Sequence, residues 1–296
     1  MTIKNINLET RKKIYPIWNI FAKRFPIAAT KIKFRLVTGE KLDLKNPRSL
    51  NQKMQKLKLY DYNNNAMVTQ CCDKYAVREY VKSCGCGEIL NELYGQWTLP
   101  EQIEWDKLPK KFVLKCNHGS GGNIICKDKE QLDKEKTIQE LKTFMAAEYG
   151  TTNIELVYDR IPRCVIAEKF IDTADGLPPK DYKIFCSYGE PKLLFVACDR
   201  YEGNVKFDFY TPDWEWLPVR NIHPNAGRIE KPPFIAEMMD YARMLSKPFP
   251  IVRVDFYYED NKVIFGELTF LHYGGMSPFD PPEYDEKFGE LFPLKN

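Results

Sequence analysis

The sequence predicts an α+β fold, in which helices and antiparallel strands occupy separate stretches of the chain. Two pairs of apolar, strand-like runs are joined by short turns, at Tyr188-Gly189-Glu190 and at Asp260-Asn261-Lys262, as expected of β-hairpins. Segments with helical periodicity precede and separate these pairs. No GxGxxG sequence opens a helix after an early strand, which disfavours a parallel dinucleotide-binding sheet.

Composition narrows the class of protein. The 296 residues suffice for one large domain or a domain with subdomains, and 44% hydrophobic with 29% charged residues is an ordinary globular composition. The net charge of +3 arises from 44 basic and 41 acidic residues. This balance disfavours a nucleic-acid-binding protein and suits a local basic cluster that binds a small anion.

Signals for export or membrane insertion are absent from the sequence. No run approaches the about 20 apolar residues of a membrane span. Lys4, Arg11, Lys12 and Lys13 interrupt the stretch where a signal peptide would have its apolar core. The nine cysteines lack the spacing of a zinc site, so we interpret them as reduced thiols and expect a cytoplasmic protein.

Residues 1–60 are predicted to form an N-terminal helical extension. A second helix in it should begin with Asn46 as cap and Pro47 at its first position, and run through NQKMQKLKLY. The first helix should pack on the body, and its basic, amphipathic character also suits contact with an anionic membrane surface at the inner face of the membrane. Its apolar residues at helical spacing are Ile14, Ile17, Ile20 and Phe21.

The remaining chain, residues 61–296, alternates helices with short strands. Helices are expected over 69–83, 131–149 and 235–246, and late in the C-terminal tail. Strands are expected over 111–116, 163–171, 181–187, 191–198, 251–258 and 263–270.

A lysine before a glycine-rich loop is the first feature with chemical meaning. Lys115 ends a predicted strand, and Gly119, Ser120, Gly121 and Gly122 follow. Glycines let backbone N–H groups approach phosphate oxygens, and the lysine adds a positive charge. The order differs from a Walker A loop, where the lysine follows the glycines. A hairpin turn with a surface lysine is the alternative.

Two acidic residues face each other in the predicted C-terminal hairpin. With a three-residue turn, Asp255 lies opposite Glu267 and Arg253 lies opposite Thr269. Two such close carboxylates repel unless a cation lies between them, and Mg²⁺ is commonly held by one or two carboxylates plus substrate phosphates. The apolar positions of the same strands, Val254, Phe256, Ile264 and Leu268, are expected to face the core.

The strand ending at residue 171 is a candidate site for an adenine base. Backbone groups of residues 168–171 could pair with the base edge, and Asp172 or Asp175 could accept from ribose hydroxyls. Lys183, on the following strand, could contact phosphate. An ordinary strand-to-loop transition is the alternative.

The order of these pieces resembles the ATP-grasp superfamily, and more closely its TupA-like branch, which is linked to teichuronopeptide biosynthesis. The resemblance covers roughly residues 45–280. It rests on NPRSLNQKMQKLKLYD, DKYAVREYV, LKCNHGSGGN, EKFI with DYKIFCSYGEPK, and VRVDFYYEDNKVIFGELTF.

The resemblance implies an ATP-grasp fold, with two α+β subdomains that clasp ATP. The lid subdomain would span about 108–172 and the metal-binding subdomain about 180–296. The implied activity is ATP-dependent carboxylate–amine ligation through an acylphosphate, attaching an amino acid or amine to a surface polysaccharide or its precursor. ATP and Mg²⁺ are the implied cofactors.

The resemblance also implies a role for each candidate residue. ATP would be bound by Lys74, Lys115, Gly119, Ser120, Gly121, Gly122, Glu168, Lys169, Phe170, Ile171, Asp175 and Lys183. Catalysis would use Arg253, Lys115 and Lys183, and Mg²⁺ would be held by Asp255, Glu267 and Thr269. Many superfamily members have Asn where this chain has Thr269, which leaves the third metal ligand open.

Two alternatives from other classes remain. A sugar-transferring enzyme would need a nucleotide-sugar site, but the sequence has no DxD motif. A non-catalytic nucleotide-binding partner is the second alternative, although Lys115, Asp255 and Glu267 are all present. His118 and His272 lie near these motifs and could either orient a substrate or only pack. Residues 274–279 could line a carboxylate pocket.

Overall fold

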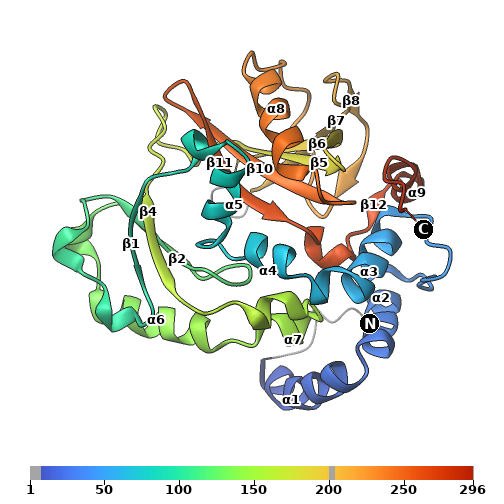
Figure 1. Cartoon of the computed structure of the whole chain (residues 1–296), viewed down its shortest axis with the longest axis horizontal. Helices are drawn as coiled ribbons and strands as arrows, with labels where there is room; N and C mark the ends of the chain where they lie inside the picture. The colour runs from blue at the N-terminus through green and yellow to red at the C-terminus, as the bar shows by residue number, and fades with distance from the viewer. Residues whose placement is uncertain (1–7, 200–203, 296) are drawn as a thin grey trace.

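Two antiparallel sheets organise the protein (Figure 1). The computed structural model describes residues 8–199 and 204–295, and side chains from residue 15 onward. A four-stranded sheet has the order β1-β4-β2-β3, and a six-stranded sheet has the order β11-β10-β5-β6-β7-β8. All strand pairs in both sheets are antiparallel, which confirms the predicted α+β class.

The four-stranded sheet has its own small core. Helix α6 (Lys134–Ala146) packs on β2 and buries Leu141 against it. The strand over 111–116 and the helix over 131–149 are confirmed, whereas β1 was not predicted. The strands are β1 (Leu93–Trp97), β2 (Phe112–Cys116), β3 (Asn123–Cys126) and β4 (Val165–Lys169).

The six-stranded sheet carries the main core. Helix α8 (Ile235–Ser246) covers one face, where Met238, Ala242 and Leu245 follow helical spacing and are fully buried. The strands are β5 (Asp181–Ser187), β6 (Glu190–Cys198), β7 (Lys206–Tyr210), β8 (Trp216–Leu217), β10 (Val252–Glu259) and β11 (Lys262–Thr269).

Several short elements complete the described chain. The remaining strands are β9 (Arg220–Asn221) and β12 (Phe279–Asp280). Two short α-helices, α7 (Tyr149–Asn153) and α9 (Glu283–Glu290), lie in the second half of the chain. The 3-10 helices are η2 (Tyr62–Asn64), η3 (Gly87–Ile89), η4 (Pro100–Gln102), η5 (Trp105–Lys107), η6 (Lys129–Gln131), η7 (Leu156–Arg160) and η8 (His272–Gly275). Within the described ranges, no helix combines the length and apolar character needed to cross a membrane.

The N-terminal part consists of α1 (Leu8–Arg24), α2 (Pro26–Thr38) and α3 (Leu50–Tyr60). Helix α2 was not predicted. Ile17 and Ile20, expected to pack inward on α1, are exposed, and Trp18 and Ala22 turn inward instead. The side chain of Ile14 lies outside the described residues.

The predicted start of α3 is wrong by three residues. Ser49, not Asn46, caps the helix, since its side-chain oxygen accepts from the backbone N–H of Gln52 at 3.3 Å. The Asp43 carboxylate accepts from the backbone N–H groups of Lys45 and Asn46, which holds this segment in a turn. The helix therefore begins after the turn, at Leu50.

The single helix predicted over 69–83 is broken into α4 (Ala66–Cys72) and α5 (Val77–Ser83). Asp73 causes the break, because its side chain accepts from the backbone N–H of Tyr75 (2.8 Å) and of Ala76 (3.2 Å). The break places Lys74 in the space between the two sheets.

The β10–β11 hairpin has a two-residue turn, not the predicted three. Asp260-Asn261 adopts positive φ at both positions (51° and 57°), as in a type I′ turn, and Glu259 pairs with Lys262. The shorter turn shifts the outer half of β11 by one residue. Val263 is therefore buried, and Ile264, expected in the core, is half-buried.

A β-bulge corrects this shift before the functional end of the hairpin. The register changes between Asp255 and Phe256, so that Asp255 pairs with Glu267 as predicted. Gly266 is the extra residue, and a Cβ there would lie only 3.0 Å from the carbonyl oxygen of Asp255. The predicted register at the carboxylates is confirmed, although the turn that led to it is not.

Candidate active site

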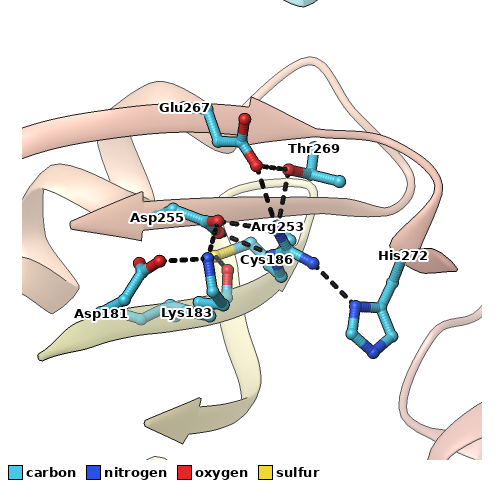
Figure 2. A network of polar contacts seen from close by, with 9 residues as sticks. Asp181, Lys183, Cys186, Arg253, Asp255, Glu267, Thr269 and His272 are labelled. Carbon is cyan, nitrogen blue, oxygen red and sulfur yellow. Dashed lines mark hydrogen bonds and ion pairs between the residues drawn. The ribbon is translucent and has the colours of Figure 1, made fainter. Parts of the chain in front are cut away.

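A largely buried ionic network extends across the neighbouring strands β5, β10 and β11 (Figure 2). Arg253 and Asp255 are two residues apart on β10 and therefore share a face. Arg253 makes a bidentate contact with Asp255, through Nε to Oδ1 (2.6 Å) and Nη2 to Oδ2 (2.7 Å). Lys183, opposite Asp255 on β5, also binds its carboxylate and pairs with Asp181 at 2.7 Å.

The network keeps Asp255 ionised although its side chain is only 1% exposed. Burial alone would raise the pKa of Asp255. The charges and hydrogen bonds of Arg253 and Lys183 outweigh this effect and lower the pKa to about 2. Burial alone would lower the pKa of Arg253, but the nearby carboxylates outweigh it and raise the pKa of Arg253 above its usual value. Both groups are therefore charged throughout the neutral pH range.

Glu267 is the solvent-facing member of the network. Its side chain is 46% exposed, and its Oε1 accepts from Arg253 Nη2 (3.3 Å) and from Thr269 Oγ1 (2.8 Å). Thr269 Oγ1 also accepts from Arg253 Nη2 at 3.0 Å. The Thr269 hydroxyl thus bridges Arg253 and Glu267.

Behind Arg253 lies a chain of neutral polar groups that sequence reasoning only partly anticipated. Arg253 Nη1 donates to His272 Nδ1 (2.7 Å), so the proton of the ring must reside on Nε2, which donates to Asn221 Oδ1 (3.1 Å). Asn221 also accepts from the Ser277 hydroxyl at 2.8 Å. Burial, then the charges of Arg253 and Lys183, hold the pKa of His272 well below its usual value. His272 therefore orients Arg253 as a neutral imidazole.

On the opposite side of the cleft, the four-stranded sheet contributes a second ion pair. Lys115 Nζ on β2 contacts Glu168 Oε2 on β4 at 2.6 Å, and Arg78 contacts Glu168 Oε1 at 3.3 Å. The Glu168 side chain therefore faces the cleft. At Lys169 the backbone N–H donates to Glu92 O (2.9 Å) and the carbonyl accepts from Asn91 Nδ2 (2.8 Å).

Lys74 joins the two halves of the site. Its Nζ donates to the carbonyl of Gly119 at 2.6 Å, and its backbone N–H donates to Asn117 O at 2.9 Å. Burial lowers the pKa of Lys74, which Glu267 opposes. Lys74 is thereby fixed against the start of the glycine-rich loop.

The glycine-rich loop requires its glycines. Gly119, Gly121 and Gly122 have positive φ, and a Cβ on Gly119 would lie 2.7 Å from the Tyr149 ring. His118, at the start of the loop, is buried, and burial lowers its pKa. It lines neither cavity described below.

These groups line a cleft of about 220 Å³ between the sheets. Its charged lining contains four basic and four acidic side chains, and apolar side chains cover one part of its wall. The charged residues are Lys74, Arg78, Lys115, Lys183, Glu168, Asp181, Asp255 and Glu267; the apolar ones are Val77, Leu90, Tyr257 and Phe265. No local sequence pattern indicated the apolar set, which comes from α5, the residue after η3, β10 and β11.

Some predicted residues lie elsewhere. Lys169, Phe170 and Ile171 do not line the cleft, and Asp175 lies on the wall of a separate cavity of about 350 Å³. Gly122 shapes the loop, since its carbonyl accepts from the Cys116 N–H at 3.0 Å.

A second cavity, of about 600 Å³, adjoins the cleft. The two share Gly119, Ser120, Asp181, Lys183 and Glu267, and the larger one is also lined by Arg253, Thr269 and His272. Gly274 and Met276 line it as well, as expected for residues 274–279. Its aromatic lining comes from Tyr149, Tyr158, Phe195, Phe207, His223 and Tyr273.

The wall of the larger cavity contains a buried charge cluster that the sequence did not reveal. Glu155 and Lys33 of α2 line the cavity, and Lys58 of α3, which is fully buried, is close enough for its charge to act on Glu155. Burial raises the pKa of Glu155 and lowers the pKa of Lys58, while each charge opposes the shift of the other. The three residues are spread over more than a hundred positions, so no local pattern links them.

The donor set fits a divalent cation that binds together with phosphates. Within residues 8–199 and 204–295, no three His, Cys, Asp or Glu side chains form a metal site by themselves. Asp255 and Glu267 project from paired strands into the cleft, among lysines that suit phosphate oxygens. Two carboxylates plus substrate phosphates are the usual environment of Mg²⁺.

The chain resembles solved structures of ligases at low sequence identity. No curated protein matches the chain. Among solved structures, a D-alanine–D-alanine ligase from Bacillus anthracis is 20% identical over 71% of this chain and 60% of its own, with a TM-score of 0.41. An L-amino acid ligase from Bacillus licheniformis is 14% identical over 97% of this chain and 63% of its own, with a TM-score of 0.49. The chain thus spans about three fifths of the length of these two structures.

The TupA-like ATP-grasp family matches residues 52–293, which include every charged residue of the cleft. This match confirms the resemblance that the sequence motifs indicated. The chain belongs to the TupA-like ATP-grasp family.

Proposed function

We propose that the protein is a Mg²⁺-dependent, ATP-consuming ligase that joins a carboxylate to an amine through an acylphosphate. One observation carries the proposal: the charged cleft and the larger cavity meet at Lys183, Asp181 and Glu267, with Arg253 on the cavity side. A nucleotide in the cleft would present its terminal phosphate at this junction, where a carboxylate from the cavity can reach it.

ATP would lie with its base toward the apolar part of the cleft and its phosphates toward the lysines. Val77, Leu90 and Phe265 offer a surface suited to a purine. Glu168, which lines the cleft, stays a candidate contact for the nucleotide, whereas Lys169, Phe170, Ile171 and Asp175 lie outside the lining of the cleft. Lys74, Lys115 and Lys183 would hold the phosphates, with Gly119, Ser120 and Gly121 covering them.

Asp255 and Glu267 would hold the metal, which supplies charge neutralisation to the phosphoryl group. Thr269 is the proposed third ligand, but its hydroxyl already contacts Arg253 and Glu267. Orienting Glu267 is the role that these contacts support best.

The proposed reaction follows from the position of the charged side chains at the junction of the cleft and the cavity. A substrate carboxylate oxygen attacks the γ-phosphorus, the bond from that phosphorus to the β,γ-bridging oxygen breaks, and ADP leaves. Arg253, oriented by His272, and Lys183 neutralise the negative charge that spreads over the phosphoryl oxygens. The amine nitrogen then attacks the acyl carbon, phosphate leaves, and the nitrogen loses a proton.

Glu155 is positioned to receive that proton. It lines the cavity, and burial raises the pKa of its carboxyl toward the range of a base that works at neutral pH. The charges of Lys58 and Lys33 oppose this rise in part.

The amine acceptor we propose is a surface polysaccharide or its precursor, acted on in the cytoplasm at the inner face of the membrane. The cavity supports an acceptor larger than a free amino acid, because it is nearly three times the volume of the cleft and carries an aromatic lining. Sugar transfer is disfavoured, since the charged groups converge on terminal phosphates.

Trapping of the acylphosphate tests the proposal. With ATP, Mg²⁺ and a pool of candidate carboxylates, hydroxylamine in place of the acceptor should give a hydroxamate of one carboxylate. Formation should require Mg²⁺ and Glu267, and should fall in Glu267→Gln. Transfer of a sugar from a nucleotide donor without ATP would refute the proposal.

A further inference from the structure

The helical hairpin α1–α2 exposes an unusual amount of apolar surface. Of the seventeen large hydrophobic side chains exposed among the described residues, seven lie between positions 15 and 36. Ile17 and Ile20 are each 72% exposed. The set is Tyr15, Ile17, Ile20, Phe25, Ile27, Ile32 and Leu36.

These side chains are not needed to pack the hairpin. On α2, Phe34 and Ala29 are fully buried, whereas Ala28, Ile32 and Leu36, at intervals of four residues, form an outward stripe. On α1, Trp18, Phe21 and Ala22 pack inward, in a cluster with Ile154 at the end of α7. Each helix therefore has a second apolar face directed to solvent.

Basic residues flank this exposed face. Residues 15–38 contain five basic side chains and no acidic one, and because the whole chain carries +3, the rest carries −2. Lys31 and Arg35 are exposed beside the stripe of Ile32 and Leu36. Positive charge interleaved with exposed apolar side chains matches the interface of an anionic bilayer.

We propose that α1–α2 docks the protein on an anionic lipid surface. Ile17, Ile20, Ile32 and Leu36 would enter the boundary between headgroups and acyl chains, and Lys31 and Arg35 would contact lipid phosphates, whereas Lys23 is paired with Glu148 and Lys33 faces the cavity. A second copy of the chain fits less well, since Lys31 and Arg35 of one copy would oppose Lys31 and Arg35 of the other. The hairpin lies outside the family match, which begins at residue 52, so membership of the family does not by itself imply this surface.

Docking would also orient the larger cavity. Helix α2 turns Lys33 and Val37 into the cavity, and Ile32 and Leu36, each one position earlier, lie about 100° around the same helix and are exposed. A bilayer bound to Ile32 and Leu36 would then lie beside the helix that lines the cavity, within about 10 Å, one helix diameter. An acceptor carried by a membrane lipid could reach the cavity without leaving the surface.

Sedimentation of the full chain with vesicles tests the proposal. Wild-type protein should bind vesicles that contain one quarter phosphatidylglycerol, bind pure phosphatidylcholine weakly, and release in high salt. Ile32→Gln/Leu36→Gln and, separately, Lys31→Glu/Arg35→Glu should each lower partitioning roughly tenfold or more. Leu99→Gln/Ile125→Gln, which removes two exposed apolar side chains of the other half of the molecule, should not.

Circular dichroism and ATP binding should be unchanged in all three double variants, which separates this proposal from that of the ligase activity. Equal binding of wild type and both α2 variants would overturn it. So would a wild-type dimer in sedimentation velocity that Ile32→Gln/Leu36→Gln dissociates, because the face would then belong to a second copy.

Discussion

Both sheets direct a lysine–carboxylate pair at the same cleft, but water reaches the two pairs to different extents. In the six-stranded sheet, the side chains of Asp255 and Lys183 are 1% and 12% exposed. In the four-stranded sheet, those of Glu168 and Lys115 are 10% and 24% exposed. The first pair is also fixed by Arg253 and, behind it, by His272.

The difference indicates a division of labour. The six-stranded sheet holds charges whose positions are set before a ligand arrives, which is the arrangement that stabilises a transition state. The four-stranded sheet holds a lysine beside a glycine-rich loop whose Ser120 and Gly121 are exposed, which suits closing over a ligand. Four substitutions probe this contrast, from the largest expected effect to the smallest.

The deepest test replaces the buried carboxylate. Asp255→Asn leaves Arg253 and Lys183 buried with less compensation, so we expect turnover to fall by roughly 10³-fold or more and stability by about 3–5 kcal/mol. The matched variant Glu168→Gln, in the other sheet, should cost less stability because Lys115 and Arg78 reach solvent. Urea denaturation measures both, and equal losses would break the contrast.

Lys115 should act on the ligand and hardly on the fold. Lys115→Met should weaken ATP binding by about tenfold or more, because it removes a cation from the triphosphate site, with little change in stability. Lys111→Met, which removes a neighbouring exposed lysine paired with Asp172, is the control. Calorimetric titration with ATP and Mg²⁺ distinguishes them, and unchanged affinity in folded Lys115→Met would remove this residue from the site.

His272 should act through Arg253 and leave a signature in pH dependence. His272→Gln should lower kcat by about tenfold with little change in KM for ATP. Because burial holds the pKa of His272 well below 6.5, the unfolded chain binds a proton that the folded chain does not as pH falls through 6.5. Wild-type stability should therefore decline below this pH, and His272→Gln should lose that part of the decline. Thermal unfolding between pH 5 and 8 would show it, and identical pH profiles would contradict the assignment.

Thr269 should give the smallest effect. Thr269→Val keeps the shape and removes the hydroxyl between Arg253 and Glu267, so we expect Mg²⁺ dependence of turnover to shift by about threefold. A shift as large as that of Glu267→Gln would instead support Thr269 as a direct metal ligand.

The fold class and the main charged residues could be predicted because they depend on local pattern. Alternating strands and the order of motifs predicted that Lys115, Lys183 and Asp255 share one site, and the three line the same cleft in the structure. The pairing of Asp255 with Glu267 was reached through a wrong turn length, and it held because the bulge at Gly266 restores the register. A bulge depends on close backbone contact, which a sequence pattern does not record.

Contacts between distant elements could not be predicted. Asn221 lies in a two-residue strand, yet it supports His272 and through it Arg253. Lys58 of α3 and Glu155, which lies just before η7, come close enough for their charges to interact only in the folded chain. Such residues are recognised by their burial and partners, and neither exists before the chain folds.

The identity of the nucleotide product tests the central claim most directly. Phosphorus NMR can follow ATP incubated with the protein, Mg²⁺ and the carboxylate found by hydroxylamine trapping. Because the lysines, Arg253 and the carboxylate pair would surround the terminal phosphate of ATP bound as proposed, we expect ADP and inorganic phosphate in equal amounts, and neither in Asp255→Asn. Formation of AMP and pyrophosphate would contradict the account, since attack would then occur at the α-phosphorus, away from these charges.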